Sequence, residues 1–307
     1  MYSFNRDISP ERYLKVFLMI LLLLLIITGI IMYKIYDDKS FADRTAIDQK
    51  GRLFGKRNIE TIFIGDSSCR RTIDEDLFSS LSGTKSLNLG LSAIYGFGGP
   101  YCMLKKAYEN NKIKNVIIMV NLGMLYDESS NDYTGLLYSM DSWSDISELT
   151  YGELSATLVS GINIVFSSET MWLAIKSYLG LGTLQVIRKE SEMYADKISL
   201  DTIITPSYGT KERDNVFLYK IISFCKKNNI NLIFVYGPAW HKVVEKSRDY
   251  IEISNKLLRS TGILLIDNIQ SIDDYHIGNT EYHISPSSRK LYTERYYNLI
   301  KPFLVVK

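Results

Sequence analysis

Ser67 is the residue in this chain whose type and position most clearly suggest chemistry. It follows a short apolar run, Thr61-Ile62-Phe63-Ile64, that ends at Gly65-Asp66. A β-branched and aromatic run that stops at a glycine predicts a buried strand followed by a sharp turn. Ligands of open parallel α/β sheets bind at the carboxyl ends of the strands. Ser67 is therefore expected where a nucleophile would be useful, provided that a base lies close enough to activate its hydroxyl.

The chain holds three histidines that could supply this base. His283 lies in a turn-rich segment after the last predicted strand and just before the C-terminal helix, so we expect it at the same sheet edge as Ser67. His241 follows the fourth predicted strand and is its competitor. His276 shares the loop of His283 but comes earlier, and we rank it third. A Ser–His pair at this edge would carry out acyl transfer.

The elements that must position these residues are apolar runs that alternate with helical patterns. Such an alternation requires crossover connections and a mostly parallel sheet. The sequence predicts an α/β fold, a three-layer αβα domain over residues 59–307 with a flavodoxin-like, five-stranded sheet. The predicted strands are Thr61–Ile64, Ser86–Leu89, Val116–Val120, Leu232–Tyr236 and Ile263–Ile266. The predicted helices are Glu75–Ser82, Gly98–Asn110, Asn215–Asn228, Arg248–Thr261 and Ser287–Phe303.

Residues 124–207 interrupt this rhythm and are predicted to be an insertion between the third and fourth strands. The segment begins acidic and rich in serine and tyrosine, and becomes more apolar and helical further on. Insertions at the carboxyl ends of strands often shape or cover a binding site. Helices that merely cap the core are the alternative, and the sequence does not decide between them.

The N-terminal region predicts a membrane anchor. An uncharged apolar run within residues 16–36 is bracketed by Lys15 and Lys34, and its length approaches the roughly 20 residues needed to cross a bilayer. A core helix would show a polar stripe and a signal peptide a clearer cleavage site. We therefore expect a tail at 1–15, a single transmembrane anchor at 16–36 and a polar linker at 37–58.

Basic residues occur on both sides of the predicted anchor, so they do not fix its orientation. Long domains that follow an anchor translocate largely regardless of their charge. We therefore expect a single-pass membrane protein whose C-terminal domain lies outside the cytoplasm.

Composition narrows the range of functions. The 36 basic and 34 acidic residues give a net charge of +2, which offers no electrostatic argument for a nucleic-acid partner. The three cysteines form no C-x-x-C pair, so the sequence predicts neither a zinc site nor another metal site. The glycines of Gly90–Gly99 lack dinucleotide-binding spacing, and no cofactor is expected.

Three motifs together resemble a known family. They are Gly65-Asp66-Ser67, Asn88-Leu89-Gly90-Leu91-Ser92 and a histidine just before the C-terminal helix. In this combination the chain resembles the SGNH (GDSL-type) hydrolase superfamily, and more closely the membrane-anchored SGNH-like proteins linked to cell-surface polysaccharide acylation. The resemblance covers about residues 59–303 apart from the insertion.

The resemblance implies roles for four residues. Ser67 would be the nucleophile and His283 its general base. The N–H of Gly90 and the side chain of Asn121 would join Ser67 N–H in the oxyanion hole, although Asn121 stands in Val-Asn-Leu-Gly rather than in the family's Gly-x-Asn-Asp.

The chain departs from the family pattern beside the base. The family has an aspartate three residues before the histidine, and here that position is Thr280. An acid in this role orients the imidazole and stabilises its cation. Glu281, Asp274 or Asp273 are candidate substitutes, and so is a backbone carbonyl.

The resulting prediction is a membrane-anchored acyl-ester hydrolase or O-acyltransferase that acts on cell-surface glycans. Its expected partners are a glycan or other acyl-ester substrate, the membrane, and a membrane protein that donates acyl groups. Two alternatives stay open. One is a catalytically inactive module of the same fold that binds or assembles surface polysaccharide, and the other is a lipid-linked esterase that faces the cytoplasm.

Overall fold

The computed structural model describes residues 14–19, 23, 45–125, 132, 133, 136, 140, 147, 149–166 and 215–305. By its internal contacts the chain divides into two units. One comprises Asp43–Ser160 with Arg188–Lys307, and the other Met1–Ala42 with Gly161–Ile187. The unit of Asp43–Ser160 with Arg188–Lys307 contains the sheet and the residues of the candidate site.

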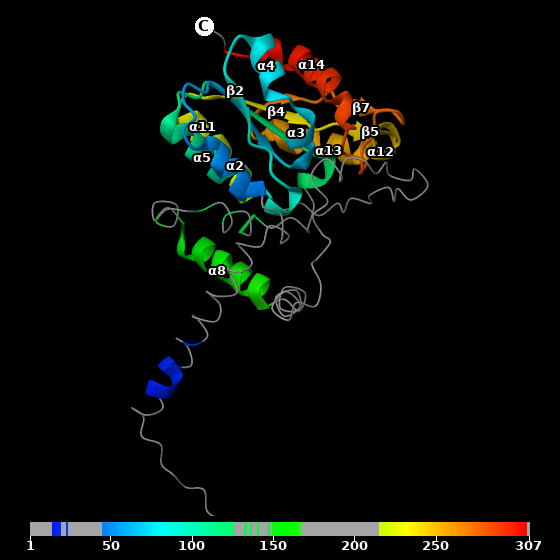
Figure 1. Ribbon diagram of the computed structural model, residues 1–307. Helices are drawn as coiled ribbons and strands as arrows, with labels where there is room; N and C mark the ends of the chain where they lie inside the picture. Colours follow the sequence, from blue (N-terminus) through cyan, green and yellow to red (C-terminus); the bar gives the residue numbers. More distant parts are fainter. Residues whose placement is uncertain are drawn as a thin grey trace, which may run out of the picture. The chain divides into compact units, whose positions relative to one another are not determined.

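Five parallel strands form the sheet in the order β2-β1-β3-β4-β6 (Figure 1). This order and the mostly parallel pairing confirm the predicted flavodoxin-like arrangement. The strand bounds differ from the predicted ones by no more than a residue at each end. The strands are β1 (Thr61–Gly65), β2 (Ser86–Asn88), β3 (Asn115–Val120), β4 (Asn231–Tyr236) and β6 (Leu264–Ile266).

Strand β3 lies at the centre of the sheet and is buried along its whole length. Its register pairs Met119 with Gly65 of β1 and Val120 with Tyr236 of β4. The residues that follow β1 and β3 therefore emerge side by side at the carboxyl edge. This register is what brings Asn121 next to the turn that carries Ser67.

Helices cover both faces of the sheet, as the predicted three layers require. Helix α5 (Gly98–Asn110) packs against α11 (Val216–Lys227) and α2 (Thr45–Leu53). Helix α14 (Arg289–Ile300) packs against α4 (Glu75–Ser82) and α3 (Ser67–Thr72). Figure 1 shows α5 and α11 on one side of the sheet and α4 and α14 on the other. Helix α13 (Arg248–Ser260) packs against β6.

Several short elements were not predicted from the sequence. Except for α2, which has nine residues, they are too short to show a hydrophobic period, which is the signal that sequence patterns provide. Besides α2 and α3, they are β5 (Ala239–Trp240), α12 (His241–Lys246), β7 (Ser271–Ile272), η1 (Ala93–Tyr95), η2 (Leu122–Leu125), η4 (Pro286–Ser288) and η5 (Lys301–Phe303).

The linker predicted at 37–58 is wrong over the part that the structure describes as α2. Ala46 and Gln49 of this helix are buried, and the Gln49 amide donates a hydrogen bond of 2.8 Å to the Gly90 carbonyl. The region is polar because the helix docks through hydrogen bonds as well as apolar contacts. Polarity alone therefore misidentified it as a linker.

Most of the predicted tail at 1–15 and most of the predicted anchor at 16–36 lie outside the described residues. No helix in the described ranges is both long and apolar enough to cross a membrane. Of the predicted insertion at 124–207, the structure describes α8 (Tyr151–Phe166) and a few neighbouring residues. Glu153 of α8 forms an ion pair of 2.6 Å with Lys220 of α11, so this helix is attached to one of the covering helices.

Candidate active site

Ser67 and His283 meet at the carboxyl edge of the sheet. The Ser67 Oγ lies 2.9 Å from the His283 Nε2, although 216 residues separate them in the chain. This distance falls within the range for a nucleophile and its general base. The structure thus brings together the two residues that the sequence placed at this edge.

The turn after β1 holds Ser67 at the first position of α3. Gly65 has φ of +150°, and a Cβ there would lie 1.8 Å from the Met119 carbonyl oxygen, so only glycine fits. Asp66 is the N-cap of α3, and its Oδ1 accepts hydrogen bonds from Ser68 N at 2.9 Å and Ser68 Oγ at 2.5 Å. The N-cap explains the Gly-Asp-Ser order, because a short acceptor is needed just before the helix.

The second carboxylate oxygen of Asp66 binds Asn121 at the end of β3. It accepts hydrogen bonds from Asn121 N at 2.9 Å and Asn121 Nδ2 at 2.5 Å. Asp66 is fully buried. Burial raises the pKa of its carboxyl above the ordinary 3.8, and the hydrogen bonds from Ser68 and Asn121 oppose that rise. Asn121 thus lies beside the Ser67 turn, and one of its two amide hydrogens is used to hold it there.

A tight loop before α14 presents His283. The Gly278 N–H donates to the His283 carbonyl at 2.6 Å and the Ser285 N–H to the His276 carbonyl at 2.7 Å, and Ile277 pairs with Ile284 in an antiparallel bridge. These bonds fix the backbone on both sides of the ring. With 8% of its surface exposed, His283 is buried.

Among the residues that the structure describes, no acidic side chain contacts the other ring nitrogen of His283. Its Nδ1 lies 2.9 Å from the Asn279 Oδ1 and 3.1 Å from the Arg71 Nη1, and Arg71 Nη1 in turn donates to the same Asn279 oxygen at 2.5 Å. An asparagine and an arginine therefore occupy the place where the sequence led us to expect an acid.

The acidic residues proposed as orienters lie elsewhere. Asp274 accepts a hydrogen bond of 2.7 Å from the Trp240 indole, and Asp273 accepts one from His276 at 2.8 Å. Within the described residues, the Glu281 side chain forms no hydrogen bond to the His283 ring. The loop turns these side chains away from His283, which spacing along the sequence could not show.

Electrostatics keep the His283 ring neutral. Burial lowers its pKa well below the ordinary 6.5, and the positive charges of Arg71 and Arg70 lower it further. A neutral imidazole is the form that can accept the serine proton. The same surroundings would make an imidazolium at His283 less stable than it would be beside a carboxylate.

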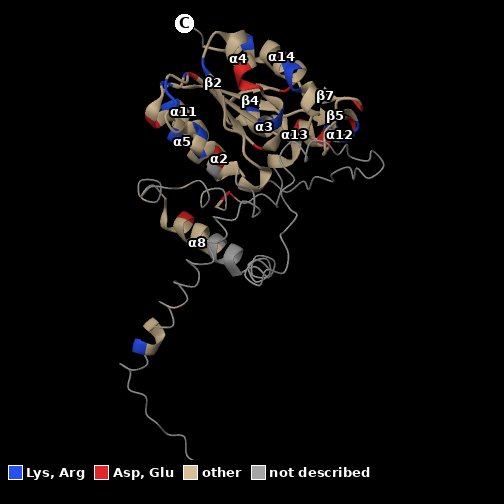
Figure 2. Ribbon diagram, in the orientation of Figure 1, with Lys and Arg blue, Asp and Glu red and all other residues tan. Residues whose placement is uncertain are grey.

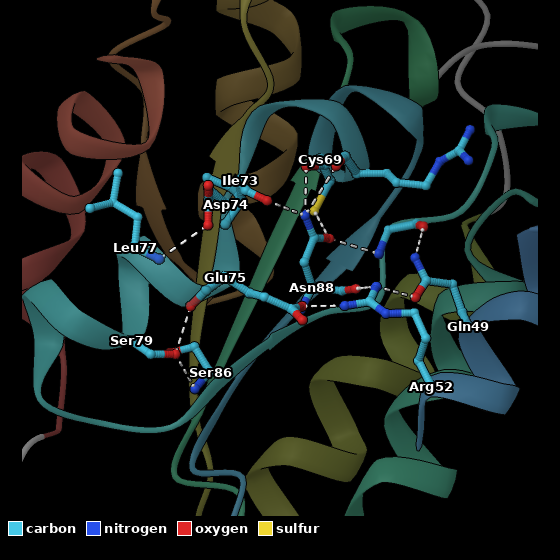
Figure 3. Close-up of polar contacts among 12 residues, drawn as sticks. Gln49, Arg52, Cys69, Ile73, Asp74, Glu75, Leu77, Ser79, Ser86 and Asn88 are labelled. Carbon is cyan, nitrogen blue, oxygen red and sulfur yellow. Dashed lines mark hydrogen bonds and ion pairs between the residues drawn. The ribbon is translucent and has the colours of Figure 1, made fainter. Parts of the chain in front are cut away.

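Asn88, at the end of β2, holds the far end of α3 (Figure 3). Its amide nitrogen donates to three carbonyls, those of Cys69 at 3.1 Å, Arg70 at 3.3 Å and Ile73 at 2.9 Å. Its Oδ1 accepts from Gly90 N at 3.0 Å. Asn88 thus adds a donor to carbonyls at the end of the helix, where two of them, those of Arg70 and Ile73, also accept from Arg289 Nη2.

Gly90 does not match its expected role as an oxyanion donor. Its N–H is already donated to Asn88, and its carbonyl accepts from Gln49. A Cβ at this position would lie 2.5 Å from Arg70 N, so glycine allows the β2 loop to pack against α3. The structure therefore gives Gly90 a packing role.

The remaining candidates stay apart from Ser67. His241 Nδ1 lies 3.4 Å from the Ile272 carbonyl, and His276 pairs with Asp273. Cys69 is buried, and burial raises the pKa of its thiol well above 9.0, so the sulfur stays protonated. The described residues contain no group of three or more metal-binding side chains placed to hold an ion.

A cavity of about 770 Å³ lies beside α2 and α4, and neither Ser67 nor His283 is among the residues that line it. Arg71, which contacts His283, is one of the residues that line it. The lining is polar or charged except for one proline, and charged residues of both signs lie around α4 and α14 (Figure 2). It comprises Thr45, Asp48, Gln49, Arg52, Arg70, Arg71, Asp74, Glu75, Asp76, Asn88, Pro286 and Arg289.

Sequence reasoning missed Arg71 and Asn279. Each lies four residues from a predicted site residue: Arg71 comes four residues after Ser67, and Asn279 comes four residues before His283. On a helix, a spacing of four places two side chains on one face. Arg71 could therefore have been placed near Ser67, but its contact with the distant loop could not.

No protein-family model matches the chain, and no curated protein matches it. Several solved structures do match the chain. A protein of the G-D-S-L lipolytic family from Desulfitobacterium hafniense DCB-2 is 12% identical over 79% of this chain and 99% of its own, with a TM-score of 0.37. A family two carbohydrate esterase from Clostridium thermocellum, in complex with cellohexaose, is 12% identical over 80% of this chain and 64% of its own, with a TM-score of 0.36. An active-site mutant of that esterase gives 13% identity, 81% and 66% coverage and a TM-score of 0.36.

The chain thus spans just under two thirds of the length of the first carbohydrate esterase chain.

Proposed function

We propose that this chain is a serine esterase or O-acyltransferase that works through an acyl-enzyme on Ser67. The observation that carries the proposal is the 2.9 Å contact between Ser67 Oγ and His283 Nε2. The low pKa of His283 supports it, because the ring stays neutral and ready to accept a proton. A buried imidazole that contacts a serine at the carboxyl edge of a parallel sheet is the arrangement expected of a nucleophile and its general base.

In the first half-reaction, Ser67 Oγ attacks the carbonyl carbon of an ester while its proton moves to His283 Nε2. The tetrahedral intermediate carries a negative oxygen. Ser67 N–H, at the start of α3, and the second amide hydrogen of Asn121 are the proposed donors to that oxygen. Such a donor contributes about 3 kcal/mol in known enzymes. Collapse of the intermediate expels the alcohol, which takes the proton from Nε2, and leaves an acyl group on Ser67.

In the second half-reaction, a hydroxyl attacks the acyl-serine and gives its proton to His283. The bond to Ser67 Oγ then breaks, and Oγ regains the proton from Nε2. Water as the attacking hydroxyl makes the protein an esterase, and a sugar hydroxyl makes it an O-acyltransferase.

The proposed substrate is an acyl ester on a glycan of the cell surface. Support comes from the cavity that Arg71 lines, whose residues are polar or charged except for Pro286. Their hydrogen-bonding groups suit the hydroxyl groups of a sugar. Together with the apolar run at 16–36, this supports a membrane-anchored protein whose domain faces outward and receives acyl groups from a membrane partner.

Covalent labelling tests whether Ser67 is the nucleophile of an enzyme. The full-length chain is treated with a fluorophosphonate, and the adduct is located by mass spectrometry. We expect one adduct on Ser67, and none in Ser67→Ala. If the wild-type chain carries no adduct, and Ser67→Ala leaves the acyl content of the surface glycans unchanged, the proposed chemistry is wrong.

The specific observation that favours a second function is the missing acid beside His283. An inactive module of the same fold, which binds or assembles polysaccharide, would need no stabilised imidazolium. In that case the Ser67→Ala chain would still bind glycan and the wild-type chain would not label. Binding by both chains with labelling of the wild type would support the enzyme.

A further inference from the structure

Asn279 contacts the active-site histidine where an amide side chain would ordinarily be harmful. An asparagine can present either its oxygen or its nitrogen to a ring nitrogen. If the amide nitrogen faced Nδ1, it would donate to it and leave the proton on Nε2. In that tautomer Nε2 has no lone pair for the serine proton, and in a serine protease the comparable Asp-to-Asn change costs about 10⁴ in rate.

Arg71 determines which amide atom faces the ring. A guanidinium has only hydrogen-bond donors. Its Nη1 lies 2.5 Å from one terminal atom of Asn279, so that atom must be the oxygen. The same atom lies 2.9 Å from His283 Nδ1. Since Arg71 is 5% exposed and His283 8% exposed, water can compete little with this arrangement.

The contacts also exclude the competing arrangement, in which Arg71 donates to Nδ1 across 3.1 Å. The Nδ1 atom would then carry a lone pair that faces the lone pairs of the Asn279 oxygen at 2.9 Å. Two acceptors at that distance repel each other in a buried site. With a proton on Nδ1, the ring and the guanidinium instead donate to the two lone pairs of one oxygen.

We propose that Arg71 and Asn279 form a composite orienter, in which Arg71 fixes the amide oxygen of Asn279 toward Nδ1 and so holds His283 in the tautomer that can activate Ser67. The inference deepens the proposed Ser67 chemistry and rests on it. Both residues are positioning residues, because they act through His283. The pair replaces the orienting function of an acid but not its negative charge.

A double-mutant cycle tests this directly. Asn279→Asp introduces an orienter with acceptors only, which no longer depends on Arg71. Arg71→Met keeps an unbranched side chain of similar bulk in place of the arginine stem and removes its donors. We expect Arg71→Met to lower the labelling rate of Ser67 in the full-length chain by about 10²–10⁴-fold when residue 279 is asparagine, with the upper value taken from the known wrong-tautomer enzyme. When residue 279 is aspartate, we expect a loss below about tenfold.

A structural role of Arg71 would give the same loss in both backgrounds, and that outcome overturns the proposal. Arg71→Lys provides a second check that is less disruptive, because lysine also has only donors. It should retain most of the labelling rate. A rate as low as that of Arg71→Met would contradict the proposal.

Nuclear magnetic resonance of ring-labelled histidine gives a readout that does not need activity. The chain has only three histidines, so His283 can be assigned by comparison with His283→Gln. We expect the hydrogen on Nδ1 in the wild type and a shift toward Nε2 in Arg71→Met. The matched control is Arg70→Met, which removes a neighbouring charge but should leave the tautomer unchanged.

The two readouts separate the two possible failures. If Ser67 never labels but the tautomer changes as expected, the proposed enzyme is wrong and the composite orienter stands. If Ser67 labels and the tautomer stays on Nδ1 in Arg71→Met, the orienter is wrong and the enzyme stands.

Discussion

Two histidines in one loop have opposite surroundings. His276 forms a hydrogen bond of 2.8 Å with Asp273, three residues earlier, and its side chain is 32% exposed. His283 is buried, contacts Ser67, and has Asn279 and Arg71 at its other nitrogen. The acid–histidine spacing expected of a triad is therefore present in this chain, but at the histidine that lies away from the nucleophile.

The comparison shows that the Asp273–His276 pair, which has the spacing expected of a triad, belongs to a local turn and does not mark the histidine that contacts Ser67. Asp273 Oδ1 also accepts from the N–H groups of Tyr275 and His276, each at 3.0 Å, so the aspartate shapes a surface turn. The base is identified by its contact with a residue from the other end of the domain. If this is right, changes at the two histidines should have very different effects.

The largest expected difference is in activity. Removal of the nucleophile or base in a serine hydrolase costs up to about 10⁶ in kcat. We expect Ser67→Ala and His283→Ala to lose at least about 10⁴-fold in hydrolysis of an activated ester such as p-nitrophenyl acetate. His276→Ala should stay within about threefold of the wild type. A comparable loss in His276→Ala would mean that the assignment of His283 as the base is wrong.

The next effect is on stability. Asn88→Ala removes the hydrogen bonds to the carbonyls of Cys69, Arg70 and Ile73 and leaves the Gly90 N–H without its acceptor. A lost hydrogen bond costs about 0.5–1.5 kcal/mol, and a buried group left without a partner about 1–3 kcal/mol. We expect the free energy of unfolding to fall by about 2–4 kcal/mol in urea titrations. Asp273→Asn, at the exposed turn, should change it by less than about 1 kcal/mol. Equal effects would mean that Asn88 does not hold α3.

The pH dependence should also reflect the buried histidine. The pKa of His283 in the folded chain lies below the 6.5 of an unfolded one. As the pH falls below 6.5, the unfolded chain takes up a proton that folded His283 does not, so stability decreases toward the folded pKa. The ring stays a base over this same interval, so kcat/KM should retain its value until the pH is well below 6.5. A decline centred at 6.5 or above would contradict the low pKa.

The smallest expected effect concerns substrate binding at the cavity. Asp48 and Asp76 line it and are exposed. We expect Asp48→Ala combined with Asp76→Ala to raise KM for an acetylated oligosaccharide by about two- to tenfold, since each lost hydrogen bond contributes about 0.5–1.5 kcal/mol. Hydrolysis of p-nitrophenyl acetate, which is too small to need the cavity, serves as the control and should not change. An unchanged KM for the oligosaccharide would show that the glycan lies elsewhere.

Much of this fold follows from residues whose signals are local. The strand that ends at Gly65 and the helix of Gly98–Asn110 have clear periods and boundaries, and both were predicted almost to the residue. Ser67 and His283 were also predicted, because the carboxyl ends of parallel strands meet at one edge.

The remaining site features depend on contacts between segments far apart in the sequence. The Arg71–Asn279 hydrogen bond spans 208 residues, and the Gly90 N–H is used by Asn88 in a loop whose path a pattern cannot show. Local spacing pointed to an acid near His283, whereas the fold of the loop turned the available acids outward. Such contacts are set by tertiary packing rather than by residue type.

Helix α2 has a practical consequence for how this domain is handled. Arg52 donates to the Asn88 carbonyl at 2.7 Å and pairs with Glu75 at 2.5 Å, while Gln49 holds the Gly90 carbonyl. A recombinant fragment trimmed to begin at residue 54 would lose the two attachments to the loop that packs against α3, at Asn88 and Gly90, and the one to Glu75 of α4. Soluble versions for crystallisation or screening should therefore start upstream of Thr45.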